Sequence, residues 1–247
     1  RQFARLVKAL DMTLKIRVSC LLFDSIGCGQ SPPPAANGGN TISAYSNQEI
    51  RNDFRALFQR HADLSLKTVV VAHSYGPSLV LPMLQEEEQV FPYLVGVVLI
   101  GTAVKSKFLP HKDGGHPLLK LPVFILNCLQ RSMTEEFLKV AIHPAHDQVK
   151  KAARVDNNAN NMRVCKYYHA NMVWATEEDL ECCIEHLPTL IVHGADDGII
   201  PIACAQHLHN RLPKSKLVVI ETASHLVQME QPEQVAKEVT SFLVTLL

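Results

Sequence analysis

The stretch that most constrains the fold of this chain runs from Lys67 to Gln89 and reads KTVVVAHSYGPSLVLPMLQEEEQ. Thr68–Ala72 is β-branched and apolar, as expected for a strand that is covered on both faces. The tetrapeptide His73–Gly76 predicts a sharp turn, and Pro77 suits the first turn of a helix, where its missing N–H costs little. We therefore expect a strand, a turn and a helix, with Ser74 at the tip of the turn.

The composition places the chain among folded globular proteins and excludes several functional classes. Of its 247 residues, 47% are hydrophobic and 19% are charged, which suits one α/β domain with a sizeable core. Lys+Arg and Asp+Glu both number 24, so no excess charge favours binding to nucleic acid or to an anionic membrane. Apolar runs such as Leu94–Gly101 and Leu121–Leu126 are too short to cross a bilayer.

The cysteines carry information about the compartment. There are seven, an odd number, and no two are spaced as a C-x-x-C pair. This pattern favours reduced thiols in an intracellular, cytoplasmic protein over a disulfide framework.

The chain alternates predicted strands and helices, which favours a mostly parallel sheet with helices on both faces. Besides the first strand, the expected strands are Arg17–Phe23, Leu94–Ile100, Thr189–His193 and Lys216–Ile220. The expected helices around them are Phe3–Leu10, Ser46–His61, Ile202–Leu212 and Pro232–Leu247. From residue 104 to 187 the strand pattern fades and helical spacing dominates, so we expect a single domain over 1–247 with a helical insertion at 104–187.

Three side chains with complementary chemistry each follow a predicted strand. Ser74 follows the first; an acidic pair, Asp196 and Asp197, follows another in LIVHGADDGIIP; and His225 follows the last in ETASHLVQMEQPE. The carboxyl ends of parallel strands meet at one edge of a sheet, where ligands bind. A histidine can take the proton of a serine hydroxyl and a carboxylate can orient the histidine, so this set predicts a nucleophilic serine. Either aspartate satisfies this reasoning.

The other histidines are interpreted differently. His73 neighbours the serine and is expected to line the site or to pack beside it, and His193 ends a strand and is expected to be buried structure. His143 and His146 stand beside Asp147, but without a further ligand of fixed spacing they indicate a solvated surface more than a metal site. We expect no metal ion and no cofactor.

Taken together, the segments FDSIGCGQS, VVVAHSYG, VHGADDGIIP and SHLVQMEQPE resemble the α/β-hydrolase superfamily, serine hydrolase type. DFRALFQRHA, PVFILNCL and EEFLKVA add a similarity to the group around α/β-hydrolase domain-containing protein eight. The resemblance implies an α/β-hydrolase fold whose helical insertion is a lid. Through the spacing G-x-x-D-x-x-x-P it also implies that Asp197 is the acid of a triad with Ser74 and His225. The backbone N–H of Tyr75 is then an expected donor to the oxyanion.

The chain departs from the family pattern at its start. Family members carry a strand and an H-G-type oxyanion loop before the first helix, and nothing of that kind precedes Phe3–Leu10. We therefore expect an incomplete family member, which lacks a strand beside the one that carries Ser74 and the usual source of a second oxyanion donor.

The function expected from these features is a serine esterase or lipase that acts on a small-molecule acyl ester or lipid. Candidate substrate-binding residues are His73, Leu121, Phe124 and Trp174, although the apolar stretch that holds Leu121 and Phe124 can equally pack on itself. The insertion can also contact a membrane surface peripherally. Two alternatives stay open: a non-catalytic binding or scaffold protein on the same fold, and a lipid acyltransferase, for which His225 and Glu230 form H-x-x-x-x-E.

Overall fold

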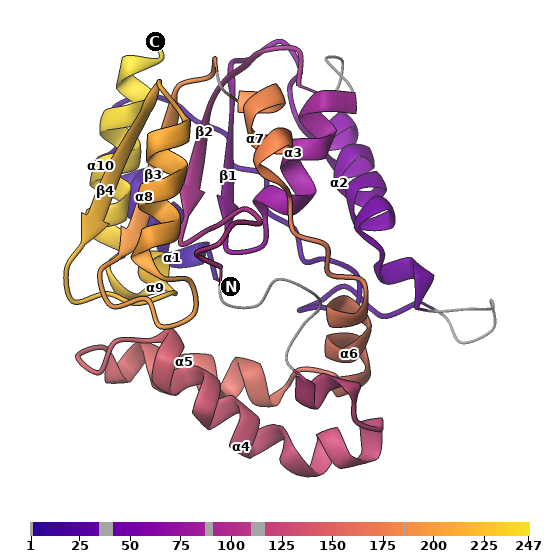
Figure 1. The fold of residues 1–247 in the computed structure, drawn as a ribbon. Coiled ribbons are helices and arrows are strands. Elements are labelled where there is room, and N and C mark those ends of the chain that lie inside the picture. The colour runs from indigo at the N-terminus through magenta and orange to yellow at the C-terminus, as the bar shows by residue number, and fades with distance from the viewer. Residues whose placement is uncertain (1, 35–41, 87–90, 110–116, 185) are drawn as a thin grey trace.

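The computed structural model describes residues 2–34, 42–86, 91–109, 117–184 and 186–247. Within these ranges it contains one sheet of four parallel strands, in the spatial order β1-β2-β3-β4 (Figure 1). The strands are β1 (Thr68–His73), β2 (Leu94–Ile100), β3 (Thr189–Gly194) and β4 (Ser215–Ile220). The predicted class, a parallel sheet flanked by helices, is therefore confirmed.

The helices account for most of the remaining described chain. They are α1 (Ala4–Thr13), α2 (Asn47–His61), α3 (Pro77–Glu86), α4 (Val123–Ala141), α5 (Asp147–Asn158), α6 (Met162–Ala170), α7 (Glu177–Ile184), α8 (Ile202–Arg211), α9 (Val227–Glu230) and α10 (Pro232–Thr245). Short 3₁₀ turns occupy Ser43–Tyr45 and Pro117–Lys120. None of these described helices is both long and apolar enough to cross a membrane.

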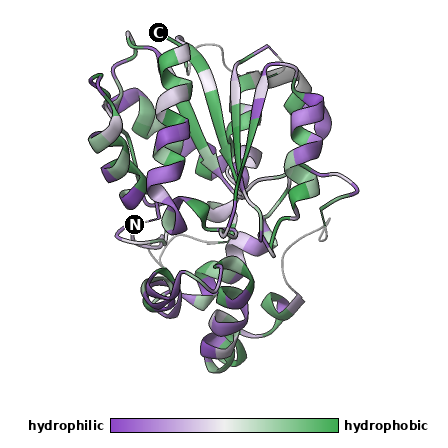
Figure 2. Ribbon diagram, turned by 90° about the vertical axis from the view of Figure 1, so that its left-hand side faces the viewer, coloured by the Kyte–Doolittle hydropathy of each residue, from purple (hydrophilic) through white to green (hydrophobic). Residues whose placement is uncertain are grey.

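The core is built on the two-residue period of the strands, which directs successive side chains to opposite faces of the sheet. From β2, Val98 and Ile100 pack with α1 and α10, whereas Val97 and Leu99 pack with α3, α7 and α8. All four side chains are buried, which is why this strand reads as a continuous apolar run. Figure 2 shows the hydrophobic colour concentrated along the strands and the helix faces that cover them.

The region predicted as a helical insertion divides into two parts. Helices α4, α5 and α6 form a bundle with its own apolar clusters, and they lie across the end of the sheet toward which the strands point (Figure 1). Helix α7 returns to the body of the protein, where Leu180 and Ile184 join the core beside α3. We call α4, α5 and α6 the α4–α6 bundle below.

The expectation of a strand at Arg17–Phe23 is wrong. No strand is assigned there, and Val18, Leu21 and Leu22 are exposed. The stretch pairs with none of the four described strands, and β1 is hydrogen-bonded to β2 alone. Without a paired neighbour its backbone gains no ladder hydrogen bonds, so its apolar pattern does not produce a strand.

The packing on β2 predicts a large effect of truncating one of its side chains. Leu99 is 1% exposed, so Leu99→Ala should lower the free energy of unfolding by about 2–5 kcal/mol, through lost burial and the cavity it leaves. The matched control is Leu66→Ala, because Leu66 is exposed and should change the free energy by about 0.5 kcal/mol or less. Urea denaturation followed by circular dichroism measures both, and equal effects would contradict the packing described.

Candidate active site

Ser74 stands at the turn between β1 and α3 in a backbone conformation that serine rarely adopts. Its φ is 54°, in the left-handed region where a non-glycine residue is strained. The turn is tight, so a Cβ on Gly76 would lie only 3.0 Å from the carbonyl oxygen of His73. The Ser74 N–H donates to the carbonyl of Ile100 on β2 at 3.0 Å, which holds the strained residue at the end of the sheet.

Tyr75, the next residue, presents two distinct groups. Its backbone N–H makes no hydrogen bond within the described part of the chain, so it is free to donate to a ligand beside Ser74. Its phenol oxygen accepts from the Val173 N–H at 2.7 Å and lies 2.8 Å from Asn47 Oδ1. Its ring meets that of Trp174 edge-on at 5.2 Å, so the chain after α6 is held against the turn.

The structure brings Ser74, His225 and Asp197 together although they are far apart in sequence. His225 Nε2 lies 3.0 Å from Ser74 Oγ, and His225 Nδ1 lies 2.9 Å from Asp197 Oδ2. The other carboxylate oxygen of Asp197 accepts the N–H groups of Ile199 and Ile200, both at 2.8 Å. Asp197 is 9% exposed and His225 is 4% exposed, so the two side chains form a hydrogen-bonded pair that is almost fully shielded from solvent behind the serine.

The two aspartates, which sequence reasoning left open, have different surroundings. Burial opposes ionisation of Asp197, but the hydrogen bond and charge of His225 and the Ile200 N–H outweigh it and lower the pKa of this carboxyl. The side chain of Asp196 is 54% exposed and lies 3.6 Å from His143 Nε2. Asp197, not Asp196, is therefore the carboxylate that meets His225.

His73 packs directly behind His225. The Gln2 amide donates to its Nδ1 at 2.7 Å, so its proton is on Nε2, which donates to the carbonyl of His225 at 2.9 Å. Burial, followed by the neighbouring His225 ring, lowers the pKa of His73 to about 3. The ring is therefore neutral near pH 7.

His193, predicted to be buried structure, lies behind the acid. It is fully buried, donates from Nε2 to the carbonyl of Ile200 at 2.9 Å, and lies 3.6 Å from Asp197 Oδ2. Burial is the largest influence on its pKa and lowers it, against the opposing attraction of Asp197. Two neutral histidines thus flank Asp197 and His225.

Two glycines let the loops approach closely: Gly101, which the sequence analysis did not single out, and Gly194, which it placed at the end of a strand without predicting this contact. Gly101, directly after β2, has a φ of +49°, and a Cβ there would lie 3.2 Å from the His225 carbonyl oxygen and 3.5 Å from Asp197 Oδ2. A Cβ on Gly194 would lie 2.2 Å from the Ser224 carbonyl oxygen. A glycine directly after a strand, at the edge where the polar residues gather, is the sequence pattern that could have indicated them.

The remaining predicted site residues lie in different surroundings. Trp174 touches Tyr75 and packs with the cluster around Ala103 and Ile200. Leu121 packs in the apolar cluster of the α4–α6 bundle, and Phe124 on α4 is 70% exposed. Their part in substrate binding stays a prediction, as does that of His73.

The fold and this arrangement of side chains define the class. A family profile described as alpha/beta hydrolase fold matches residues 1–232, so the chain belongs to the α/β-hydrolase fold family.

The relatives and structural neighbours agree with that assignment. Protein ABHD8 from Homo sapiens is 26% identical over 242 residues, covering 95% of this chain and 51% of the relative. The chain thus spans about half the length of the curated relatives it matches. A bromoperoxidase from Bacillus anthracis superposes with a TM-score of 0.76 at 19% identity, over 99% of this chain and 87% of the other. A thermophilic esterase from Thermogutta terrifontis gives a TM-score of 0.66 at 21% identity, over 90% and 78%.

The neutral state of His73 predicts a specific pH dependence of stability. Its pKa is about 3 in the fold against an ordinary value of 6.5, so between these values the unfolded chain binds a proton that the folded chain does not. The free energy of unfolding should fall as pH decreases through this interval, by at most about 1.4 kcal/mol per pH unit from this group. Urea titrations across the interval should show a shallower slope for His73→Gln, and an unchanged slope would refute the assignment.

Proposed function

We propose that this protein is a serine hydrolase that cleaves a carboxylic ester through an acyl-enzyme on Ser74. The observation that carries the proposal is the continuous relay from Asp197 through His225 to Ser74 Oγ, at 2.9 and 3.0 Å. Each contact is within the reach required of a base and its nucleophile. The tip of the turn is partly exposed, and the positive end of α3 behind it favours negative charge on an attacked carbonyl oxygen.

In the proposed reaction, His225 Nε2 takes the proton of Ser74 Oγ as that oxygen bonds to the carbonyl carbon of the ester. The carbonyl oxygen becomes an oxyanion, and the free N–H of Tyr75 donates to it. The ester C–O bond then breaks, and the imidazolium gives its proton to the departing alcohol. Water, deprotonated by His225, releases the acid from Ser74 and restores the hydroxyl.

Asp197 supports this cycle in two ways. Its hydrogen bond from Nδ1–H fixes the tautomer of His225 that leaves Nε2 free to accept the serine proton. Because its pKa is lowered, it stays ionised while His225 is transiently charged. The neutral His73 and His193 add no opposing positive charge to that imidazolium.

We further propose that the substrate is a lipid or other apolar acyl ester and that the α4–α6 bundle acts as a lid. Exposed apolar side chains on and before α4, Leu118 and Phe124, support this substrate class, as does the aromatic ring of Trp174 beside the turn. The bundle's position across the strand ends supports the lid (Figure 1), and its apolar side chains would make any peripheral membrane contact. The five described free cysteines fit an intracellular, cytoplasmic location.

Covalent labelling tests the nucleophile directly. A fluorophosphonate probe should label the wild-type chain, and Ser74→Ala should abolish the labelling because Ser74 carries the hydroxyl that lies 3.0 Å from His225 Nε2. Ser241→Ala, at an exposed serine on α10, is the matched control and should label like the wild type.

A folded protein that fails to label would favour the alternative, a binding or scaffold protein on this fold. The oxyanion supports that alternative. An oxyanion hole normally has a second donor besides the Tyr75 N–H, and a site without one such donor is about 10²–10³-fold slower. Adding a lysolipid acceptor to an active enzyme and identifying the product separates hydrolysis from acyl transfer.

The two neighbouring aspartates form a matched pair for a kinetic test. Asp197→Asn should lower kcat by about 10⁴-fold, the order found when the corresponding group of a serine protease is replaced. Asp196→Asn should stay close to the wild-type kcat, since its side chain is half exposed and meets His143. Hydrolysis of p-nitrophenyl esters measures both, and a larger loss in the Asp196 variant would exclude the proposed relay.

A further inference from the structure

Glu230 is a buried carboxylate to which the proposed mechanism gives no part. It is 6% exposed and ends α9, the short helix that follows His225. Its two oxygens accept the Ser224 N–H at 3.1 and 3.2 Å, and one of them also accepts the His143 N–H at 2.8 Å. A single carboxylate therefore joins the residue before His225 to the chain that follows α4.

The end of α4 makes further bonds to the same segment. The last turn of a helix leaves carbonyls without intrahelical partners, and here the carbonyl of Val140 accepts the Ser224 hydroxyl at 2.7 Å. The carbonyl of Ala141 accepts the Leu226 N–H at 3.1 Å. The residues on both sides of His225 are thus bonded to the end of α4.

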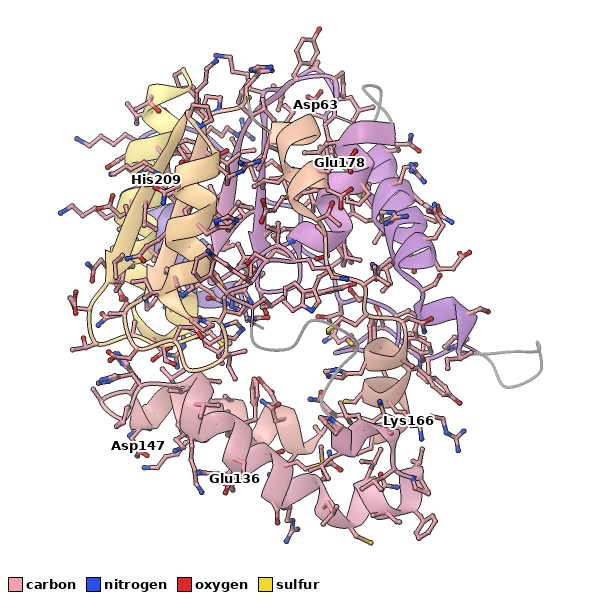
Figure 3. All side chains as sticks on the ribbon, in the orientation of Figure 1. Asp63, Glu136, Asp147, Lys166, Glu178 and His209 are labelled. Carbon is pink, nitrogen blue, oxygen red and sulfur yellow. The ribbon has the colours of Figure 1, made fainter. Side chains whose placement is uncertain are left out.

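The loop of the acid meets the same helix end. The Gly198 N–H, next to Asp197, donates to the Val140 carbonyl at 3.2 Å. Apolar contacts reinforce the junction, because Leu226 and Met229 pack with residues of α4 and α5 in one buried cluster. The labelled acids of these two helices, Glu136 and Asp147, are exposed (Figure 3), so Glu230 differs from them in being turned into the protein.

We propose that Glu230 is a positioning residue for His225: its carboxylate fixes the main chain at Ser224 against the α4–α6 bundle and thereby aims the imidazole at Ser74 Oγ. The inference rests on the proposed hydrolase function for its kinetic consequence, but the positioning itself is a property of the folded chain. Glutamine has the same shape with one acceptor oxygen, and its NH₂ group would face one of the two N–H donors. Replacing Glu230 by Gln should therefore shift the main chain at Ser224 without leaving a cavity.

The test compares Glu230→Gln with Glu233→Gln, which removes the same charge from an exposed position three residues later. For Glu230→Gln, kcat should fall by about 10²-fold with KM nearly unchanged, as expected when a reacting group is misplaced slightly. The control should match the wild type in both. If Glu230→Gln does not fold, Ser224→Ala, which removes the tether to Val140, should show a smaller loss in the same direction.

A second readout does not depend on activity. A proton held between an imidazole and a carboxylate resonates well downfield of the amides, and the Nδ1 proton of His225 is assigned by its loss in His225→Gln. We expect this resonance to broaden or disappear in Glu230→Gln and to persist in Glu233→Gln. If the wild type neither labels nor hydrolyses esters, the proposed function fails. The positioning of His225 by Glu230 is then tested by the Nδ1 resonance alone. A resonance that persists in a folded Glu230→Gln would overturn the inference, whatever the effect on kcat.

Discussion

The constraint on which this structure depends is the close approach of two loops at the end of the sheet. Gly194 lets the end of β3 contact the backbone of Ala223 and Ser224, where a Cβ would lie 2.2 Å from a carbonyl oxygen. This contact brings the loop of the acid beside the loop of the histidine, and the Ala195 and Asp196 N–H groups bond to the end of β4 and its loop. Because the two backbones are fixed in this way, the side chains of Asp197 and His225 lose little conformational freedom when they form their hydrogen bond.

The surroundings of that pair stabilise the negative charge of Asp197. Asp197 is held ionised by two backbone N–H groups and by His225, while desolvation keeps His73 and His193 neutral. In a poorly solvated site, a buried charge such as that of Asp197 is stable only when its hydrogen bonds are complete. The neighbouring His73 and His193 bond instead to the backbone carbonyls of His225 and Ile200. They support the two loops without adding charge, which suits a site where the imidazole must gain and lose a proton.

Much of this could be predicted from the sequence because it depends on local pattern. The apolar runs of β2 and β3 and the turn around Ser74 are encoded within a few residues. The order of serine, acid and histidine after successive strands indicated one edge of a parallel sheet. The choice of Asp197 over Asp196 came from a family resemblance, since the residues alone left it open. What could not be predicted depends on tertiary contact. Glu230 could be interpreted as a structural residue after the histidine, but its bond to the His143 N–H could not be foreseen, nor could the close approach of Gly101 to His225. The stretch at Arg17–Phe23 has strand composition, but an apolar pattern does not reveal whether a neighbour will pair with it.

The place of β1 at the margin of the sheet affects the serine it carries. Among the described strands, β1 is hydrogen-bonded to β2 alone, and the strained φ of Ser74 is opposed by that single ladder, which ends in the bond to Ile100. Strands at a margin open more readily than central ones, because fewer interactions resist their local unfolding. The nucleophile thus follows an edge strand of the described sheet, as His225 follows the other edge strand, β4, while Asp197 follows the central strand β3. Whatever lies against the outer side of β1 therefore sets how firmly the serine is presented to its substrate.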